Sequence, residues 1–386
     1  MSPTLRKPTS TELRIFFSLF AVRLAVFVIG ILLFLLINPP VPGQPLSNLA
    51  QETWGRWDTR HYLLLSTDGY TNVRDEGYLL VFFPLYPLLI RGLTQVTFLS
   101  PYAAGVLLSW IFFSLAGVFI YKLVRLDFDQ KTARQTLKYL ALFPMSFFFG
   151  MAYTESLFLL LLAMFFYFLR KRYLLWAAIV LYLAAITRLQ GILLVIPAMV
   201  EVYWNWRTHT NRSLWANKRS AIQTAIGFLL FGAMGFGTYL LLNKVVAGNW
   251  IEFLHIQKEN WHTSFIFFGS VVFNQLSLIG YEKNPALLFG TWLPQLLMFV
   301  LSIGMIGVGY FKKVRLSYLA HWTIHLLISF SASWLLSGVR FMLPIFFLYL
   351  VLALSAKSKL VDAIITITLA LLLSTSIVLF LQNGVL

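Results

Sequence analysis

The sequence has no cysteine and few charged residues. Without a thiol among its 386 residues, the chain forms no disulfide, no thiolate metal site and no covalent thiol intermediate. Charged side chains make up 11% of the residues and hydrophobic ones 59%, whereas a soluble globular domain is about one quarter charged. This composition excludes a soluble fold and indicates a chain that is embedded in membrane lipid.

Long apolar runs recur along the chain from Phe16 to Phe380. A helix that crosses a bilayer needs about 20 predominantly apolar residues. The first run, Ile15 to Ile37, is longer than the apolar core of a signal peptide and no small-residue cleavage pattern follows it, so we expect a retained span. No repeat or linker divides the chain. The sequence therefore predicts one all-α polytopic membrane domain over residues 1–386.

The formal net charge of +16 comes from short basic groups between the apolar runs. Such a distribution is typical of cytoplasmic loops and not of a nucleic-acid-binding surface, so we expect membrane lipids and no nucleic acid as partners. The six groups are Arg6, Lys7 and Arg14; Lys122, Arg125, Lys131, Arg134 and Lys138; Arg170, Lys171 and Arg172; Arg207, Arg212, Lys218 and Arg219; Lys312, Lys313 and Arg315; Lys357 and Lys359.

Spans placed between these groups number about eleven, with the N-terminus cytoplasmic and the C-terminus outside. Two long outer segments remain, residues 38–102 and 244–286, and each contains an apolar run that would break this topology if it crossed. We expect these runs to form interfacial or re-entrant helices over a site. The predicted spans are 15–37, 103–122, 137–150, 153–169, 173–187, 190–206, 221–243, 287–310, 316–334, 340–355 and 360–381.

The first outer segment is acidic and aromatic. It holds the carboxylates Glu52, Asp58, Asp68, Asp75 and Glu76. Asp58 follows a span closely, and a carboxylate at the lipid boundary suits a general base that takes a proton from a sugar hydroxyl. The alternative is a solvated loop with interfacial tryptophans. Its neighbours, candidates for substrate binding, are Arg56, Trp57, His61 and Tyr62.

Three isolated charges lie at turns between apolar helices: Glu155, Arg188 and Arg340. An ionisable group at such a position is costly unless it is paired or hydrated. A guanidinium binds phosphate in a bidentate manner, so Arg188 and Arg340 are candidates for holding a phosphate, with Glu155 beside them. The alternative is a structural Glu155–Arg188 pair that closes the helix bundle.

The second outer segment alternates polar and aromatic residues from Trp250 to His262. Rings bind the faces of a sugar and polar groups bind its hydroxyls, so Gln257, Lys258 and Trp261 are candidate substrate-binding residues. The alternative is an amphipathic interfacial helix with no ligand.

Five motifs resemble, in order, the GPI mannosyltransferase II (PIG-V-like) family in its prokaryotic form, from about residue 54 to residue 350. They are Trp57-Asp58 with His61-Tyr62 and Gly69-Tyr70, Phe82-Phe83-Pro84-Leu85-Tyr86-Pro87, Tyr153-Thr154-Glu155-Ser156-Leu157-Phe158, Thr187-Arg188-Leu189-Gln190-Gly191 and Arg340-Phe341-Met342-Leu343-Pro344.

The resemblance implies a GT-C type bundle in the cell membrane that works at the outer face. It implies an inverting transfer of a sugar, commonly mannose, from a polyprenyl- or dolichyl-phosphate carrier to a glycan, lipid or protein acceptor. Asp58 matches the family's base, and Glu155 and Arg188 match its cavity. One departure is Leu189, where proline often follows the arginine. A divalent metal is compatible with this chemistry but not required by it.

Two other classes of protein fit the composition. A transporter or lipid flippase would use intramembrane charges to line a path for an ion or a headgroup, and it predicts inverted repeats and broken helices. Neither feature is visible in the sequence. A structural or assembly subunit would need no charged cavity.

Overall fold

The structure is a computed structural model that describes residues 8–39, 48–72, 77–208 and 218–383. Helices make up 79% of it, and its described residues form no strand, only an isolated antiparallel bridge between Phe265 and Ala332. The prediction of an all-α chain is confirmed for the described residues. Arg6, Lys7, Asp75, Glu76 and Arg212, which were assigned above to loops, lie outside the described residues.

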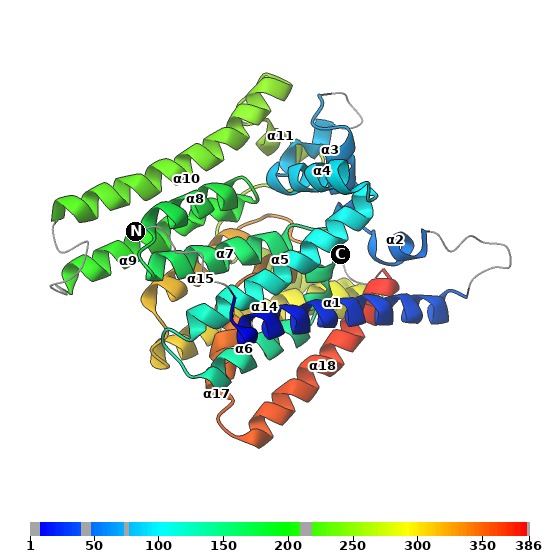
Figure 1. The fold of residues 1–386 in the computed structure, drawn as a ribbon. Helices are drawn as coiled ribbons and strands as arrows, with labels where there is room; N and C mark the ends of the chain where they lie inside the picture. Colours follow the sequence, from blue (N-terminus) through cyan, green and yellow to red (C-terminus); the bar gives the residue numbers. More distant parts are fainter. Residues whose placement is uncertain (1–7, 40–47, 73–76, 209–217, 384–386) are drawn as a thin grey trace.

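The helices follow one another along the chain with short connections (Figure 1). Their bounds are α1 (Ser10–Ile37), α2 (Leu49–Trp54), α3 (Asp58–Thr67), η2 (Gly77–Val81), α4 (Leu85–Thr97), α5 (Pro101–Val124), α6 (Gln130–Leu142), η3 (Ser146–Gly150), α7 (Glu155–Arg170), α8 (Leu174–Ala185), η4 (Leu189–Leu194), α9 (Val195–Arg207), α10 (Lys218–Ala247), α11 (Glu252–Glu259), α12 (Ser270–Tyr281), α13 (Pro285–Leu287), η5 (Leu288–Trp292), α14 (Leu293–Phe311), α15 (Leu316–Ser329), α16 (Gly338–Met342), α17 (Phe347–Ser355) and α18 (Lys359–Leu381).

Among the described residues, five helices are long and apolar enough to cross a membrane. They are α1, α5, α10, the continuous helix Pro285–Phe311, which comprises α13, η5 and α14, and α18. Each contains an apolar stretch of the length that the hydrocarbon core of a bilayer requires. All five coincide with predicted spans, so the chain is a helical protein of membrane-spanning type.

The other six predicted spans form shorter or interrupted helices. Proline accounts for two interruptions, because its ring blocks the preceding helical turn and removes a backbone donor. Helix α6 ends at Leu142, before Pro144, and Pro344 separates α16 from α17. The number of eleven crossings therefore stays a prediction.

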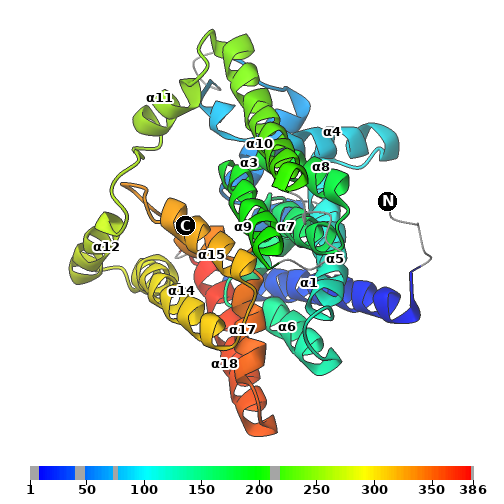
Figure 2. The ribbon, with the colours of Figure 1, turned by 90° about the vertical axis from the view of Figure 1, so that its left-hand side faces the viewer.

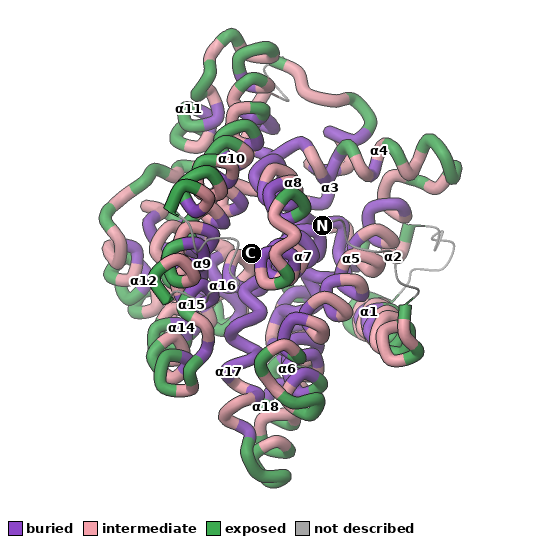
Figure 3. The backbone as a smooth tube through the Cα atoms, turned by 60° about the vertical axis from the view of Figure 1, so that its left-hand side comes forward, coloured by how far each residue is buried: buried purple, intermediate pink, exposed green. Residues whose placement is uncertain are grey.

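Helices α7 and α17 form the centre of the molecule. Helix α5 packs against α7, α7 against α8, and α8 against α10, while α17 packs against α6 and α14. Most residues of α7 and α17 are buried, as the purple tubes in Figure 3 show. A helix that is apolar on every side is suited to such a position. These short helices are therefore enclosed by protein, and the long helices lie outside them.

Both predicted outer segments contain short helices. The first carries α2, α3, η2 and α4, and Figure 2 shows the extended chain that joins α11 to α12 in the second. Helix α4 is amphipathic: Tyr86 and Ile90 are buried on one side, whereas Val96 and the adjoining Phe98 are exposed. Exposed apolar side chains next to a buried face are typical of a helix at a lipid interface. The depth of these helices in a bilayer stays a prediction.

Helix α1 packs against the rest of the protein through a few buried residues, which include Arg23. The Arg23 guanidinium donates hydrogen bonds to the carbonyl oxygens of Ser146 and, at 2.8 Å, Ala141. These carbonyls lie where α6 ends and η3 begins, and the last carbonyls of a helix have no partner within it. The guanidinium carbon also lies 4.5 Å from the centre of the Phe113 ring. Arg23 thus joins α1 to the break between α6 and η3.

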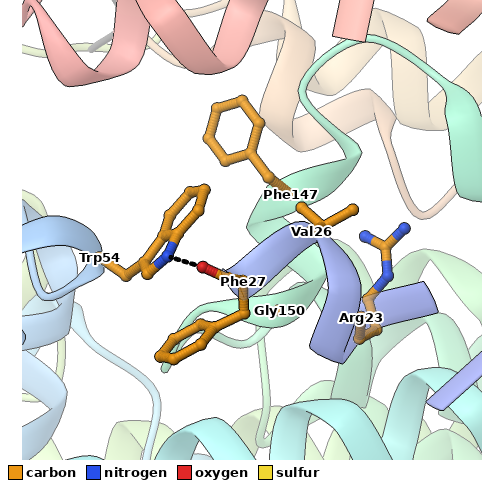
Figure 4. A pocket seen from close by; sticks show the side chains of 6 residues that line it. All are labelled: Arg23, Val26, Phe27, Trp54, Phe147 and Gly150. Atoms are coloured by element: carbon orange, nitrogen blue, oxygen red, sulfur yellow. Dashed lines mark hydrogen bonds between the residues drawn. The ribbon is translucent and has the colours of Figure 1, made fainter. Parts of the chain in front are cut away.

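Trp54 joins α1 to the first outer segment. Its Nε1 donates to the carbonyl oxygen of Phe27 at 3.0 Å, beside a cavity of about 10 Å³ that Phe147 also lines (Figure 4). Its ring passes directly over Gly30, where a Cβ atom would lie 1.9 Å from Trp54 Cζ2. The indole therefore requires glycine at this position of α1.

Replacing Gly30 with alanine should displace Trp54 and lower the stability of the folded protein in detergent by about 1–3 kcal/mol, the usual cost of overpacking. Gly227→Ala is the matched control, because Gly227 also lies in a long apolar helix but no neighbouring atom lies within 4 Å of the position that a Cβ atom would take there. Thermal unfolding of both variants tests this expectation. Equal unfolding temperatures for the two variants would contradict it.

Candidate functional site

Four charged side chains from distant parts of the sequence meet in one cluster, the charge quartet: Asp58, Glu155, Arg188 and Arg340. Arg340 Nη2 lies 2.7 Å from Asp58 Oδ2, and Arg340 Nε lies 3.3 Å from Glu155 Oε1. Arg188 Nη1 donates a hydrogen bond to the same Glu155 oxygen at 3.2 Å. The Glu155 side chain is only 2% exposed. Glu155 is therefore the buried partner that the two arginines share.

Both carboxylates of the quartet begin a helix. Asp58 is the first residue of α3, and Glu155 is the first residue of α7. The N-terminal end of a helix carries unpaired N–H groups and a partial positive charge, so it favours a carboxylate. Arg340 lies in α16, and Arg188 has extended backbone just before η4. The four side chains thus come from four separate elements.

Gly191 allows the tight backbone turn that positions Arg188. The N–H of Gly191 donates to the Arg188 carbonyl oxygen at 2.9 Å. A Cβ atom on Gly191 would lie 1.9 Å from the backbone oxygen of Ala184 in α8. Only a residue without a side chain allows this close approach. The glycine of the Thr187–Gly191 motif therefore has a packing role that fixes Arg188.

The residues before Asp58 are anchored on both sides. The Arg56 side chain donates to the carbonyl oxygens of Phe380 and Leu381 at 3.1 and 3.2 Å, at the end of α18. The Tyr153 hydroxyl donates to the Arg56 carbonyl oxygen at 2.9 Å. Arg56 thus has structural partners outside the quartet. Its predicted role in substrate binding stays a prediction.

Trp57 adopts a left-handed backbone conformation, with φ of 52°. This conformation is uncommon for a residue with a large side chain, and it turns the chain immediately before the first turn of α3. The Trp57 side chain is 39% exposed. It lies beside Asp58 in the chain and is available to a ligand.

Aromatic rings surround the two arginines. The guanidinium carbon of Arg340 lies 5.1 Å from the centre of the Tyr153 ring, and that of Arg188 lies 5.3 Å from the centre of the Phe341 ring. Tyr62, one turn after Asp58, is buried, and its hydroxyl lies 3.4 Å from Thr154 Oγ1. Burial raises the pKa of Tyr62 above its ordinary value, so the hydroxyl stays protonated and neutral. Aromatic rings thus cover part of the quartet, and the Asp58 side chain remains 18% exposed.

The two outer segments meet in an aromatic cluster of His61, Tyr78, Phe82 and Trp261. The His61 ring centre lies 5.1 Å from that of Phe82 and 5.9 Å from that of Trp261. His61 Nδ1 and Trp261 Nε1 are buried and have no hydrogen-bond partner among the described residues. The structure thus places Trp261 near His61, and the role of both residues in substrate binding stays a prediction.

Gln257 and Lys258 are not brought to the quartet. The Lys258 side chain is exposed and Gln257 is half-buried, and the described part of the structure gives neither side chain an ion pair or hydrogen bond. Both residues belong to α11, one turn before Trp261. Their predicted role in substrate binding stays a prediction.

Gln295 is a buried polar residue beside the quartet that the sequence motifs do not include. Its Oε1 accepts the N–H of Gly338 at 2.8 Å, at the start of the helix that carries Arg340. Its Nε2 has no hydrogen-bond partner within the described chain. The sequence signal for Gln295 was a single amide side chain within an apolar run. Many amide side chains in such runs have only a packing role.

The described residues contain no group of three or more histidine or acidic side chains arranged to hold a metal ion. His321 and His325 are buried in α15 with ring centres 5.5 Å apart. His325 Nε2 lies 2.9 Å from the Phe341 carbonyl oxygen. That bond connects α15 to the helix bearing Arg340.

Comparison of the chain with protein-family models and with curated protein sequences gives no match. The likeness to the PIG-V-like family therefore depends on the five sequence motifs, which contribute all four residues of the quartet.

Glu155→Gln should leave the largely buried Arg188 without its carboxylate partner and lower the free energy of unfolding by about 3–5 kcal/mol. The double variant Glu155→Gln/Arg188→Gln removes one charge of each sign and should be more stable than Glu155→Gln alone. Thermal or denaturant unfolding in detergent measures both effects.

The matched control is Glu12→Gln, because Glu12 pairs with Lys122 at a more exposed position, 3.5 Å apart. Exposed pairs contribute about 1 kcal/mol or less, so this variant should resemble the wild type. The single variants Glu155→Gln and Arg188→Gln complete the comparison. If the double variant loses as much stability as these two single variants added together, Glu155 and Arg188 do not interact.

His61 should make folding stability depend on pH. Burial lowers the pKa of His61 below its ordinary value, opposed in part by Asp58. The unfolded chain therefore binds the proton first, and the stability due to neutral His61 is lost as the pH falls below about 6.5. Unfolding temperatures between pH 7.5 and 5 should fall less steeply for His61→Gln than for the wild type. Parallel curves would contradict this expectation.

Proposed function

We propose that the protein is a GT-C type membrane glycosyltransferase. It transfers a sugar, in the first instance mannose, from a polyprenyl- or dolichyl-phosphate carrier to a glycan, lipid or protein acceptor at the outer membrane face. The observation that carries the proposal is the charge quartet, in which a carboxylate at the edge of an apolar bundle lies directly against a buried arginine. The order of the five motifs supports the same class.

Asp58 supplies the base. Its carboxylate takes the proton of an acceptor hydroxyl while that oxygen attacks the anomeric carbon of the donor sugar. A bond forms between the acceptor oxygen and the anomeric carbon, and the bond from that carbon to the phosphate oxygen breaks. The electron pair leaves with the lipid phosphate, and attack from the opposite face inverts the anomeric configuration. The proton on Asp58 then returns to water.

Arg340 and Arg188 stabilise the leaving phosphate. Negative charge on the phosphate grows as the glycosidic bond breaks, and fixed cations in a site of low dielectric stabilise it strongly. Both arginine side chains are 11% exposed. Lys258, the other predicted cation, is exposed and is the weaker candidate. The arginines are therefore assigned to the phosphate.

The ion pair between Arg340 and Asp58 should keep the site inactive in the absence of donor. Without donor, Arg340 Nη2 lies 2.7 Å from Asp58 Oδ2 and occupies this oxygen. A donor phosphate competes with Asp58 for the same guanidinium. Binding of donor should therefore free Asp58 to accept a proton when the anomeric carbon is in place.

The aromatic cluster supplies a surface for sugar. Aromatic rings pack against the apolar faces of sugar rings, and the unpartnered nitrogens of His61 and Trp261 can bind hydroxyl groups. His61 lies in the helix that begins with Asp58, in the first outer segment, and Trp261 follows α11 in the second. This arrangement supports binding of the sugar between the two segments.

Asp58→Asn should lower the rate of sugar transfer about 100-fold or more, because it removes the general base while keeping the shape of the side chain. The measurement uses purified protein in liposomes, polyprenyl phosphates carrying radiolabelled mannose, glucose or arabinose, and a mixed acceptor extract. Asp68→Asn is the matched control: Asp68 caps the other end of the same helix and is exposed. It should transfer sugar at the wild-type rate.

The same liposomes distinguish a transporter. Wild-type protein that moves the labelled lipid between leaflets but transfers no sugar to any acceptor would replace the glycosyltransferase with a lipid flippase. A folded Asp58→Asn protein that is fully active would remove Asp58 as the base and leave the class of protein intact.

A further inference from the structure

A small cavity is lined in part by Arg340 and by no other residue of the charge quartet. Its volume is about 10 Å³, enough for one water-sized group, and its polar lining includes Gln295, Arg340, Thr291 and Ser337. It is formed between the N-terminal end of the Pro285–Phe311 helix and α16. No carboxylate is among the described residues that line it.

The orientation of Gln295 is fixed by the backbone. Its Oε1 accepts the N–H of Gly338, and an N–H group requires an oxygen opposite it, so the amide NH₂ must point the other way. Gln295 is 1% exposed, and Nε2 has no hydrogen-bond partner in the part of the chain that is described. A buried donor without a partner is costly, and here the donor belongs to a residue that lines a cavity, so it is available to a ligand.

The local backbone is shaped to permit this arrangement. A Cβ atom on Gly338 would lie 2.9 Å from Gln295 Oε1, so glycine allows the amide to reach the backbone. The residues before Gln295 form a single π-helical turn, Leu288–Trp292, that includes Gly290 and Thr291 of the cavity. Such turns are rare and are often found at functional sites.

We propose that this cavity is a subsite for one non-bridging oxygen of a lipid phosphate ester, bound by Gln295 Nε2 and the Arg340 guanidinium. The assignment to a lipid phosphate rests on the proposed function. The amide and the guanidinium both donate, so they select a group that only accepts hydrogen bonds, as an ionised phosphate oxygen does. Gln295 also positions Arg340 through Gly338, so one residue binds the phosphate and orients its cation.

Binding of farnesyl phosphate, farnesol and inorganic phosphate to the full-length protein in detergent tests this subsite. Gln295→Glu keeps the oxygen that accepts the Gly338 N–H and replaces the donor with a second oxygen. It should bind farnesyl phosphate at least about tenfold more weakly than the wild type, with farnesol binding unchanged. Gln295→Met, which removes the donor and the acceptor of the Gly338 N–H without adding charge, should show at least the same loss.

Gln275→Glu is the matched control. Gln275 is also 1% exposed and its amide has no partner among the described residues, but it does not line this cavity. It should bind all three probes like the wild type. Inorganic phosphate that competes with farnesyl phosphate in the wild type and not in Gln295→Met would support recognition of the phosphate group itself.

Unchanged affinity for farnesyl phosphate in both Gln295 variants would overturn the subsite and leave a bound water as the occupant. Equal loss of farnesol binding would also overturn it, because the defect would then concern the apolar tail. Binding of farnesyl phosphate that depends on Gln295, in a protein that transfers no sugar, would keep the subsite and remove the glycosyltransferase. Sugar transfer by Gln295→Met with wild-type donor affinity would remove the subsite alone.

Discussion

The arrangement of the site depends on the buried carboxylate of Glu155. One of its oxygens lies 3.2 Å from Arg188 and 3.3 Å from Arg340, so a single atom connects α7 to the turn before η4 and to α16. A charge buried in a medium of low dielectric is stable only when it is paired, and each member of this group therefore requires the others. The position of Arg340 against Asp58 follows from that constraint, since the shared carboxylate holds the guanidinium at Nε while Nη2 contacts Asp58.

The quartet contains two carboxylates and two guanidiniums, so its formal charge is zero before a ligand binds. A lipid phosphate would add negative charge to this neutral group. In the proposed reaction the acceptor proton moves to Asp58 as charge develops on the leaving phosphate, so one carboxylate becomes neutral when the arginines must stabilise another anion. The proton transfer and the departure of the phosphate thus balance each other electrostatically, and neither arginine is left without an anionic partner.

Part of this organisation was predictable because a charge in an apolar sequence is conspicuous. Glu155, Arg188 and Arg340 stood alone between apolar runs, and the cost of burying them implied that they meet. The pairing of Arg340 with Asp58 was not predictable, because it depends on how elements from opposite ends of the chain pack together. Gln295 resembles any amide in a helix until its neighbours are known. Arg23 gave a visible signal within the first apolar run, but its partners are backbone carbonyls, which no sequence pattern marks.

The same reasoning explains why composition alone does not distinguish a central helix from a helix exposed to lipid. A helix enclosed by protein and a helix exposed to lipid have the same apolar composition, and α7 and α17 are short and mostly buried. Enclosure by other helices allows breaks in the backbone, because neighbouring protein groups satisfy the polar atoms that lipid would leave unpaired. Arg23 does this for the carbonyls at the end of α6, and Arg56 does it for those at the end of α18. Polar side chains thus satisfy backbone carbonyls at these two helix ends. Asp58 begins α3 two residues after Arg56, and Glu155 begins α7 after the η3 segment that Arg23 contacts.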